Sequence, residues 1–181
     1  GHAHAGESTV ARYLSYGVTS VRQVGGSLDG LTSLNRRIAA DSTPGPRLYI
    51  AGETITGAPL VWPGQTVLQT PADAEAAVAR LAAGGVSQIK LYTHTTRELM
   101  EAVVQAARTR NIPVTAHLGY VDAVTAATMG VNALEHLSGE SYVDFEIYSE
   151  AERDALQQQM TDLKVRAFGL TDERDQHLIV V

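Results

Sequence analysis

Residues 88–117 read QIKLYTHTTRELMEAVVQAARTRNIPVTAH, and this stretch indicates the fold class of the chain. It begins and ends with short apolar and β-branched runs, 88–92 and 113–117, which predict two strands. Between them, apolar residues recur at helical spacing, and Thr95 with Glu98 forms a capping box. Pro113 prevents the helix from continuing into the second run. The stretch is therefore a strand–helix–strand unit.

The same alternation extends on both sides of this unit. Further strands are predicted at 18–24, 47–51 and 133–136, and further helices at 71–83 (capped by Thr70), at 122–128 and after Ser149. Nearly continuous apolar strands that alternate with helices are typical of a parallel sheet buried on both faces. We therefore expect an α/β fold with right-handed crossovers, and we treat residues 1–181 as a single domain. The order alone does not distinguish a barrel from an open sheet.

Composition excludes several classes of protein. The chain has 181 residues, of which 44% are apolar, no cysteine and a formal net charge of -6. An acidic chain without clustered basic residues disfavours nucleic-acid binding, and the lack of cysteine excludes disulfides and thiolate catalysis. No apolar run approaches the roughly 20 residues that span a bilayer, and we find no signal sequence. We expect a cytoplasmic protein without a membrane partner.

Four histidines lie at or near the ends of predicted strands. His2 and His4 are two residues apart, so in an extended chain both imidazoles face the same side and can reach one ion. His117 ends the strand 113–117, and His136 ends the strand 133–136. Parallel-strand enzymes gather their ligands at the carboxyl ends of the strands. These four side chains therefore predict a metal site.

Lys90 is the one charged residue inside the apolar run Ile89-Lys90-Leu91. Burying an ammonium group is costly, and a lysine in such a place tends to lose its proton. A neutral amine can react with carbon dioxide to form a carbamate, which is an anion with two oxygen atoms. We predict that a carbamylated Lys90 bridges two cations. Taken alone, a lysine in such a position is more often a snorkelling residue or a strand-end lysine that reaches water.

Two further residues are candidates for substrate binding. Tyr92 and His94 follow Lys90 at the end of the same strand, where they can line the mouth of a pocket. The alternative for Tyr92 is packing in the core. The alternative for His94 is a solvent-exposed position in a loop.

Six short stretches together resemble a known family. They are His2-Ala3-His4, YGVTSVRQVGG at 16–26, GPRLYIAG at 45–52, IKLY at 89–92, PVTAH at 113–117 and LEH at 134–136. In this order they resemble the amidohydrolase superfamily, and within it the prolidase-like and imidazolonepropionase-like metal-dependent hydrolases. The resemblance covers about the first 140 residues. It implies a (β/α)8 TIM-barrel-type fold with a binuclear site, commonly of zinc.

The resemblance also implies a role for each candidate ligand. His2 and His4 hold one metal ion, His117 and His136 hold the other, and the carbamate of Lys90 bridges both. The family further uses an aspartate after the eighth strand as metal ligand and general base. The stretch RAFGLTD at 166–172 is similar to the family's final Gly-Thr-Asp but has Leu170 interposed, so Asp172 is the candidate for this role. A turn aspartate is the alternative.

The sequence departs from the family pattern at both ends. The body of the first strand is missing, and only 45 residues (181 minus 136) follow His136, too few for the last three βα units. A complete barrel takes about 250 residues. We therefore expect a barrel that is incomplete in this chain and apparently truncated at both ends.

Three functions follow from these residues. The first is a metal-dependent hydrolase that cleaves an amide, peptide-like or cyclic C–N bond of a small molecule by means of a metal-activated water. The second is a non-catalytic or degenerate metal-binding barrel fragment that self-associates through exposed strand edges into a homo-oligomer. The third is a one-metal, deaminase-like relative, which Lys90 disfavours because a bridging lysine has no use there.

Overall fold

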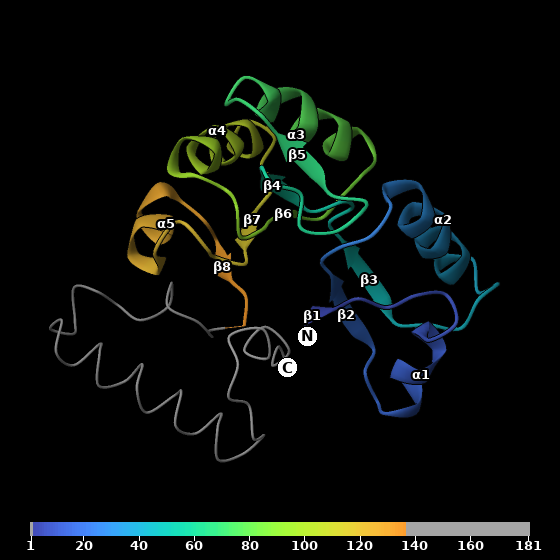
Figure 1. The fold of residues 1–181 in the computed structure, drawn as a ribbon. Helices are drawn as coiled ribbons and strands as arrows, with labels where there is room; N and C mark the ends of the chain where they lie inside the picture. Colours follow the sequence, from blue (N-terminus) through green and yellow to red (C-terminus); the bar gives the residue numbers. More distant parts are fainter. Residues whose placement is uncertain (1, 137–181) are drawn as a thin grey trace, which may run out of the picture. The chain divides into compact units, whose positions relative to one another are not determined.

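The computed structural model describes residues 2–136, which lie in one compact unit of the chain. Its parallel strands form two sheets (Figure 1). The first has the order β1 (His2–Ala3), β2 (Ser20–Gln23), β3 (Arg47–Ile50). The second has the order β5 (Thr66–Leu68), β4 (Ile55–Gly57), β6 (Ile89–Leu91), β7 (Val114–Ala116), β8 (Ala133–Leu134). The helices are α1 (Val10–Ser15), α2 (Leu28–Ala39), α3 (Asp73–Ala83), α4 (Arg97–Arg108) and α5 (Ala123–Met129). The predicted parallel α/β fold is confirmed.

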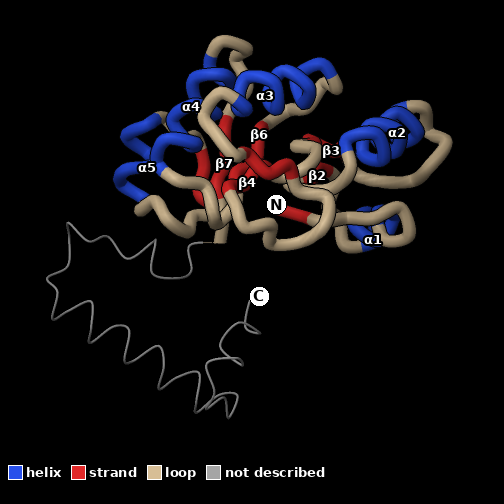
Figure 2. Tube along the Cα trace, turned by 45° about the horizontal axis from the view of Figure 1, so that its top comes forward, coloured by secondary structure: helices blue, strands red, loops and turns tan. Residues whose placement is uncertain are grey.

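The strands follow a curved path with the helices on its outer side (Figures 1 and 2). A backbone hydrogen bond from Ser87 N to Ile50 O, 2.8 Å long, links the segment before β6 to the end of β3 and so joins the two sheets. Within residues 2–136, β1 and β8 are edge strands, and the described strands do not close into a barrel. The arrangement is a TIM-barrel-type arc rather than a closed barrel, and the single-domain prediction for residues 1–181 extends beyond the described residues.

Two helices form where the sequence predicted them, with one change of cap. Helix α4 is capped by Thr96, whose hydroxyl accepts a hydrogen bond from Leu99 N. The predicted cap, Thr95, is instead buried, and its hydroxyl donates to Tyr92 O at 2.7 Å. Helix α5 is capped by Asp122, as its predicted range of 122–128 implied.

The prediction was less accurate around the other helices. Helix α3 begins at Asp73 rather than Pro71, because the Asp73 carboxylate accepts hydrogen bonds from the backbone and hydroxyl of Thr70. Thr70 is therefore part of a turn and not a helix cap. Helices α1 and α2 and strands β4 and β5 were not predicted. Gly30 and several polar residues weaken the apolar pattern of α2, while β4 and β5 have only three residues each.

The central strands are buried on both faces. All three residues of each of β4, β6 and β7 are buried, including the polar residue in the middle of each strand. Most of the core is aliphatic, but Lys90 and Thr115 lie within it on neighbouring strands, directly opposite each other. A buried lysine and a buried threonine at one register position mark the part of the sheet where the candidate site lies.

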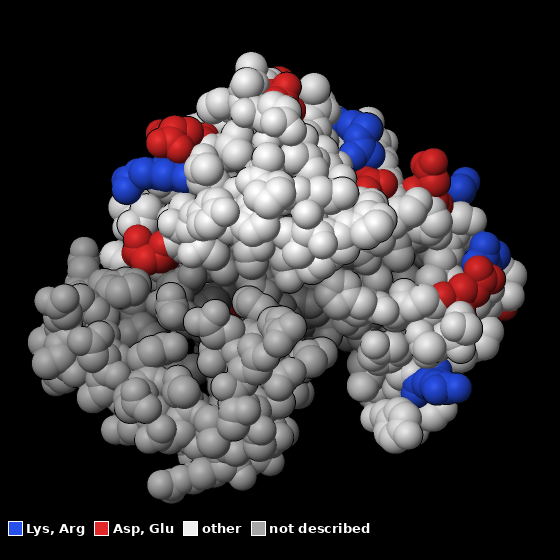
Figure 3. Space-filling model, in the orientation of Figure 1, with Lys and Arg blue, Asp and Glu red and all other residues white. Residues whose placement is uncertain are grey.

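Some charged side chains of the outer surface pair with opposite charges. Ion pairs join Arg80 to Glu53 and Arg37 to Glu7. On the face drawn in Figure 3, the described part of the chain shows mixed charges and no basic patch. None of the helices within residues 2–136 is both long enough and apolar enough to cross a membrane.

Candidate metal centre

Four histidine rings that the sequence singled out lie in contact with one another. His2 Nε2 is 3.0 Å from His4 Nε2, and the centroid of the His2 ring is 4.6 Å from that of His136. The His136 ring is in turn 4.8 Å from the His117 ring. His4, His117 and His136 follow the carboxyl ends of β1, β7 and β8, and His2 is the first residue of the two-residue strand β1. Residues up to 134 positions apart thus form one cluster.

Lys90 lies close enough to this cluster for its charge to lower the pKa values of all four histidines, and its side chain is almost completely buried, at 1% exposure. Within the described part of the chain, its Nζ atom has no hydrogen-bond partner. Burial lowers the pKa of Lys90 to about 8, although the charge of Glu135 opposes this shift. The positive charge of Lys90 in turn contributes to the lowered pKa values of His4 and His136. The amine and the imidazoles therefore share one electrostatic environment.

His117 is the most perturbed histidine of the cluster. Burial, together with the charges of His136 and Lys90, lowers its pKa to about 4. Its Nδ1 atom is buried and has no hydrogen-bond partner among the described residues. A neutral imidazole with an unpaired nitrogen is the form that binds a metal ion.

Sequence reasoning missed Glu135, which links the histidines to the strands below. Its buried carboxylate accepts hydrogen bonds from His2 Nδ1 at 2.8 Å, Arg22 Nη2 at 2.5 Å and Thr115 Oγ1 at 2.5 Å. Burial raises the pKa of a carboxyl group, yet the hydrogen bonds from Thr115 and His2 and the charges of Lys90 and Arg22 lower the pKa of Glu135 to about 2. Glu135 is therefore ionised at neutral pH. The only sequence signal was an acidic residue inside a predicted strand.

Gln88 holds the arginine of this network in place. Its Oε1 atom accepts two hydrogen bonds from Arg22, and its Nε2 atom donates to Tyr49 O at 3.0 Å. Gln88 therefore connects β2 and β3 to the start of β6. The network extends across four strands, so it fixes the relative positions of the elements that bear the histidines.

His136 has a left-handed backbone conformation, with φ of 75°. This region is costly for a residue with a Cβ atom, by roughly 1 kcal/mol or more. The side chain of the preceding residue, Glu135, belongs to the hydrogen-bond network. Two consecutive residues therefore make different contacts. Glu135 accepts hydrogen bonds within the network, and the ring of His136 contacts the rings of His2 and His117.

The donor set fits a divalent cation, although it is not arranged around one. Among residues 2–136, no three His, Cys, Asp or Glu side chains are preset as a ligand group. The Nε2 atoms of His2 and His4 share a hydrogen bond at 3.0 Å, which a cation bound to both would replace. The unpaired Nζ of Lys90 and Nδ1 of His117 are the atoms that ligation would satisfy. Imidazole and oxygen donors suit several first-row metals, zinc included.

The candidate substrate-binding residues border the cluster on one side. The Tyr92 ring lies 4.6 Å from the His117 ring and 4.1 Å from that of Trp62. His94 is turned to the loop after β4, where its Nδ1 lies 2.7 Å from Pro59 O, and its ring stacks on Tyr120. Tyr92 is therefore adjacent to the histidines and His94 one step further out. Asp172, the candidate general base, lies outside the described residues, as does the predicted helix after Ser149.

Comparison with known proteins identifies relatives of this arrangement. The model of the amidohydrolase family matches residues 2–156. A bottromycin amidohydrolase of known structure is 27% identical, with a TM-score of 0.71, and the match covers 87% of this chain and 36% of that one. A Xaa-Pro dipeptidase with methionine bound in its active site is 28% identical, with a TM-score of 0.59, and the match covers 72% and 39% of the two chains. A search of curated proteins found no significant match.

The matched region is a part of each of these proteins. The chain matches less than two fifths of the length of the bottromycin amidohydrolase and of the dipeptidase. The residues matched by the family model, 2–156, contain β1 to β8 and therefore the histidine cluster, Lys90 and Glu135.

Proposed function

This chain belongs to the amidohydrolase family, and from that membership we propose that it is a metal-dependent hydrolase of an amide, peptide-like or cyclic C–N bond in a small molecule. The observation that carries the proposal is Lys90, a buried amine without a hydrogen-bond partner in the described part of the chain, whose charge acts on all four imidazoles. Leaving such a group unpaired costs roughly 1–3 kcal/mol. Perturbed ionisable groups that converge in this way are typical of functional sites.

We assign two divalent cations, most suitably Zn²⁺, to this cluster. His2 and His4 would hold one ion, His117 and His136 the other, and Lys90, as a carbamate, would hold both. The lowered pKa values of all four histidines keep the imidazoles neutral and able to act as ligands at pH 7. The pKa of about 8 gives Lys90 a substantial neutral fraction in mildly alkaline solution, which is the form that reacts with carbon dioxide.

The reaction we propose uses groups in named roles. Bound cations supply an acidified water and a polarised scissile carbonyl. Glu135 holds His2 through Nδ1 and keeps Nε2 directed at the cluster. Tyr92, whose hydroxyl has a pKa raised by burial, remains protonated and can donate a hydrogen bond to the substrate. We assign the transfer of the proton to the leaving amine to an aspartate, with Asp172 as the candidate.

Metal analysis combined with a substrate panel tests this proposal. We expect elemental analysis of the purified chain to give two divalent metal ions, and dipeptides, amides, esters and lactones to reveal metal-dependent turnover. His117→Ala and Lys90→Ala should abolish turnover, while Tyr16→Ser, at a residue that is 85% exposed, should leave it unchanged. A chain that binds no divalent metal, or turnover that survives both substitutions, would refute the proposal. One metal per chain would favour the deaminase-like alternative.

A non-catalytic, self-associating fragment remains the second candidate, favoured by one observation. Strands β1 and β8 are edge strands within residues 2–136, and an edge strand is a template for pairing with another chain. Light scattering of the purified chain measures its oligomeric state. Oligomers without turnover on the panel would support this candidate, whereas metal-dependent turnover would exclude it. We retain a cytoplasmic location as a prediction.

A further inference from the structure

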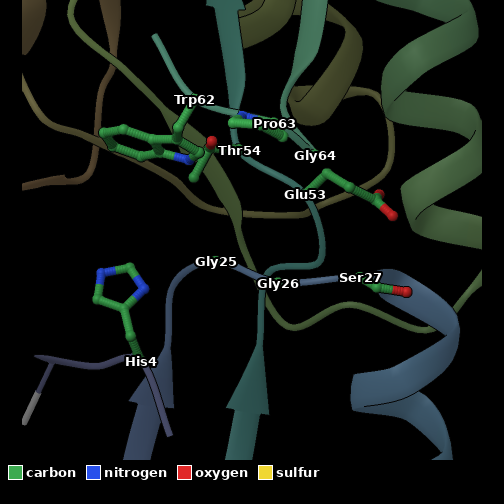
Figure 4. Close-up of a pocket in the computed structure, with 9 residues that line it drawn as sticks. All are labelled: His4, Gly25, Gly26, Ser27, Glu53, Thr54, Trp62, Pro63 and Gly64. Carbon is green, nitrogen blue, oxygen red and sulfur yellow. The ribbon is translucent and has the colours of Figure 1, made fainter. Parts of the chain in front are cut away.

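A pocket of about 340 Å³ adjoins the histidine cluster on the side of His4 (Figure 4). One wall is the turn at Gly25 and Gly26 that follows β2, and the opposite wall is the loop that bears Trp62. Glu53 lies at the far end from His4. The volume is within the range of small-molecule sites, and none of the roles assigned above uses this space.

The loop that bears Trp62 is apolar and exposed, yet held in place. Leu60, Val61 and Trp62 are 50%, 40% and 39% exposed. Gln65 fixes the loop from inside, because its Oε1 accepts hydrogen bonds from the backbone N–H groups of Val61 and Trp62 and its Nε2 donates to Thr54 at 3.0 Å. Three consecutive exposed apolar residues on an anchored loop are unfavourable in water unless they contact something.

The wall opposite Trp62 is bare backbone. A Cβ atom added to Gly25 would lie 3.1 Å from Cε1 of His4, so a side chain there would press on the imidazole. Gly26 has φ of 141°, a conformation that side chains rarely adopt. The two glycines therefore leave a flat surface beside His4 and opposite the indole ring. A slot between a flat backbone and an aromatic ring suits a flat group.

Charge at the far end of the pocket limits what can enter. The Glu53 carboxylate accepts hydrogen bonds from Leu28 N and from Arg80 Nη1, both at 2.9 Å. It thus occupies the amino end of α2, where an anion would otherwise bind. An incoming carboxylate would meet a fixed negative charge instead, and an incoming cation would find that charge already paired. The pocket therefore favours a neutral group.

Aromatic contacts join this pocket to the candidate metal centre. Trp62 contacts Tyr92, whose ring contacts His117, and His4 itself lines the pocket. A substrate that places its scissile bond at the histidines has this slot as the nearest space for a substituent.

We propose that the pocket between Gly25, Gly26 and Trp62 binds a neutral, flat apolar substituent of the substrate, such as an aromatic side chain next to the scissile bond. That the bound molecule is a substrate rests on the proposed function, but the binding itself requires no metal and no turnover. It predicts that the preferred substrates carry an aromatic group and that acidic analogues are rejected.

Trp62 is the single tryptophan of the chain, so its fluorescence reports on this pocket directly. We would titrate the full chain, treated with a chelator, with N-acetylphenylalaninamide, N-acetylglycinamide and N-acetylaspartate. We expect a saturable change of emission with the first compound and at least about tenfold weaker binding of the other two, because only the first buries a flat apolar ring. Equal responses to all three compounds would overturn the proposal.

Variants measured by titration calorimetry locate the binding. Trp62→Ala should weaken the binding of N-acetylphenylalaninamide about tenfold or more, and Trp62→Phe should restore most of it. Leu60→Ala is the matched control, since it removes an exposed apolar side chain of the same loop that does not line the pocket. Glu53→Gln should improve the binding of N-acetylaspartate. Unchanged affinity in Trp62→Ala would overturn the proposal.

The test separates this proposal from the proposed function. Selective binding without hydrolysis of any panel compound would support the pocket and refute the hydrolase. Hydrolysis with the same kcat/KM for phenylalanyl, glycyl and aspartyl amides would support the hydrolase and refute the pocket.

Discussion

The Nδ1 atom of His2 donates a hydrogen bond to Glu135 Oε2 over 2.8 Å, although the two residues are 133 positions apart in the sequence. Glu135 is ionised and can only accept, so the proton must reside on Nδ1. This fixes the tautomer of His2 and leaves its Nε2 without a proton, so that Nε2 accepts the hydrogen bond from His4 Nε2 over 3.0 Å. A histidine whose second nitrogen binds a carboxylate is oriented for metal binding before the metal arrives.

Glu135→Gln should weaken metal binding by about 10- to 100-fold. The substitution replaces the charged carboxylate that accepts the hydrogen bond from His2 Nδ1 with a neutral amide, which orients the imidazole less strongly. Competition with a chromophoric chelator measures the affinity. In the metal-free chain, ¹⁵N chemical shifts of the His2 ring should show the loss of the Nδ1–H tautomer, a change that a general loss of stability does not produce.

Glu75→Gln is the matched control for this prediction. Glu75 is also paired with an arginine, Arg110, but its side chain is 64% exposed and far from the histidines in sequence and contact. Its substitution should leave metal affinity unchanged. Equal metal affinities of the Glu135→Gln variant and the wild type would show that Glu135 does not contribute to metal binding.

Lys90→Met should make the metal-free chain more stable and the metal-loaded chain less so. Methionine fills the same space without a buried, unpaired amine, so we expect the free energy of unfolding in urea with chelator to rise by roughly 2 kcal/mol. The same variant should bind fewer metal ions, and added bicarbonate should no longer increase its metal content. Arg12→Met, at an exposed residue, should change neither quantity. A destabilised metal-free variant would contradict this account of Lys90.

Acid should destabilise the metal-free chain at pH values well above the pKa of Glu135. The pKa of His117 is about 4 in the folded chain against 6.5 for an ordinary histidine, so the unfolded chain binds more protons between these values. Stability is therefore complete above pH 6.5 and falls as the pH approaches 4. Because the ring is only partly buried, we expect a loss on the order of 1–2 kcal/mol. Urea unfolding at several pH values should give a flatter profile for His117→Asn, and parallel profiles would contradict the assignment.

Gly57→Ala should destabilise the chain by roughly 1–3 kcal/mol, as overpacking does. A Cβ atom at Gly57 would lie only 2.1 Å from the backbone oxygen of His94, and backbone cannot move aside as a side chain can. Gly6→Ala is the control, because a Cβ atom there meets nothing within 4 Å. Thermal unfolding of the two variants measures the difference. Equal melting temperatures would show that the loop after β6 tolerates displacement.

The sequence predicted those parts of the site whose signal is local. His2 and His4 are recognisable from their spacing, and Lys90, His117 and His136 from their place in or after apolar strands. The parallel α/β fold followed from the alternation of strands and helices around residues 88–117. Each of these features depends on residues within one element and its immediate neighbours.

Glu135, Arg22 and Gln88 could not be found in this way. Their roles depend on pairing between strands that are distant in the sequence, so a charged or polar residue in a predicted strand does not by itself reveal its partner. The helix caps at Thr95 and Thr70 failed for a related reason. Several threonines and an aspartate compete for the same backbone groups, and the choice among them is made by packing, which placed Thr95 in the interior.

The long separation between His2 and Glu135 also constrains the order of events during refolding. The helices and the β6–β7 unit involve contacts between near neighbours, whereas the cluster requires β1 to dock beside β2 and the end of β8 to reach β1. Contacts between distant segments form late because closing long loops costs entropy. Uptake of metal should therefore lag behind the recovery of helical circular dichroism, and a partly assembled chain offers the ion no binding site.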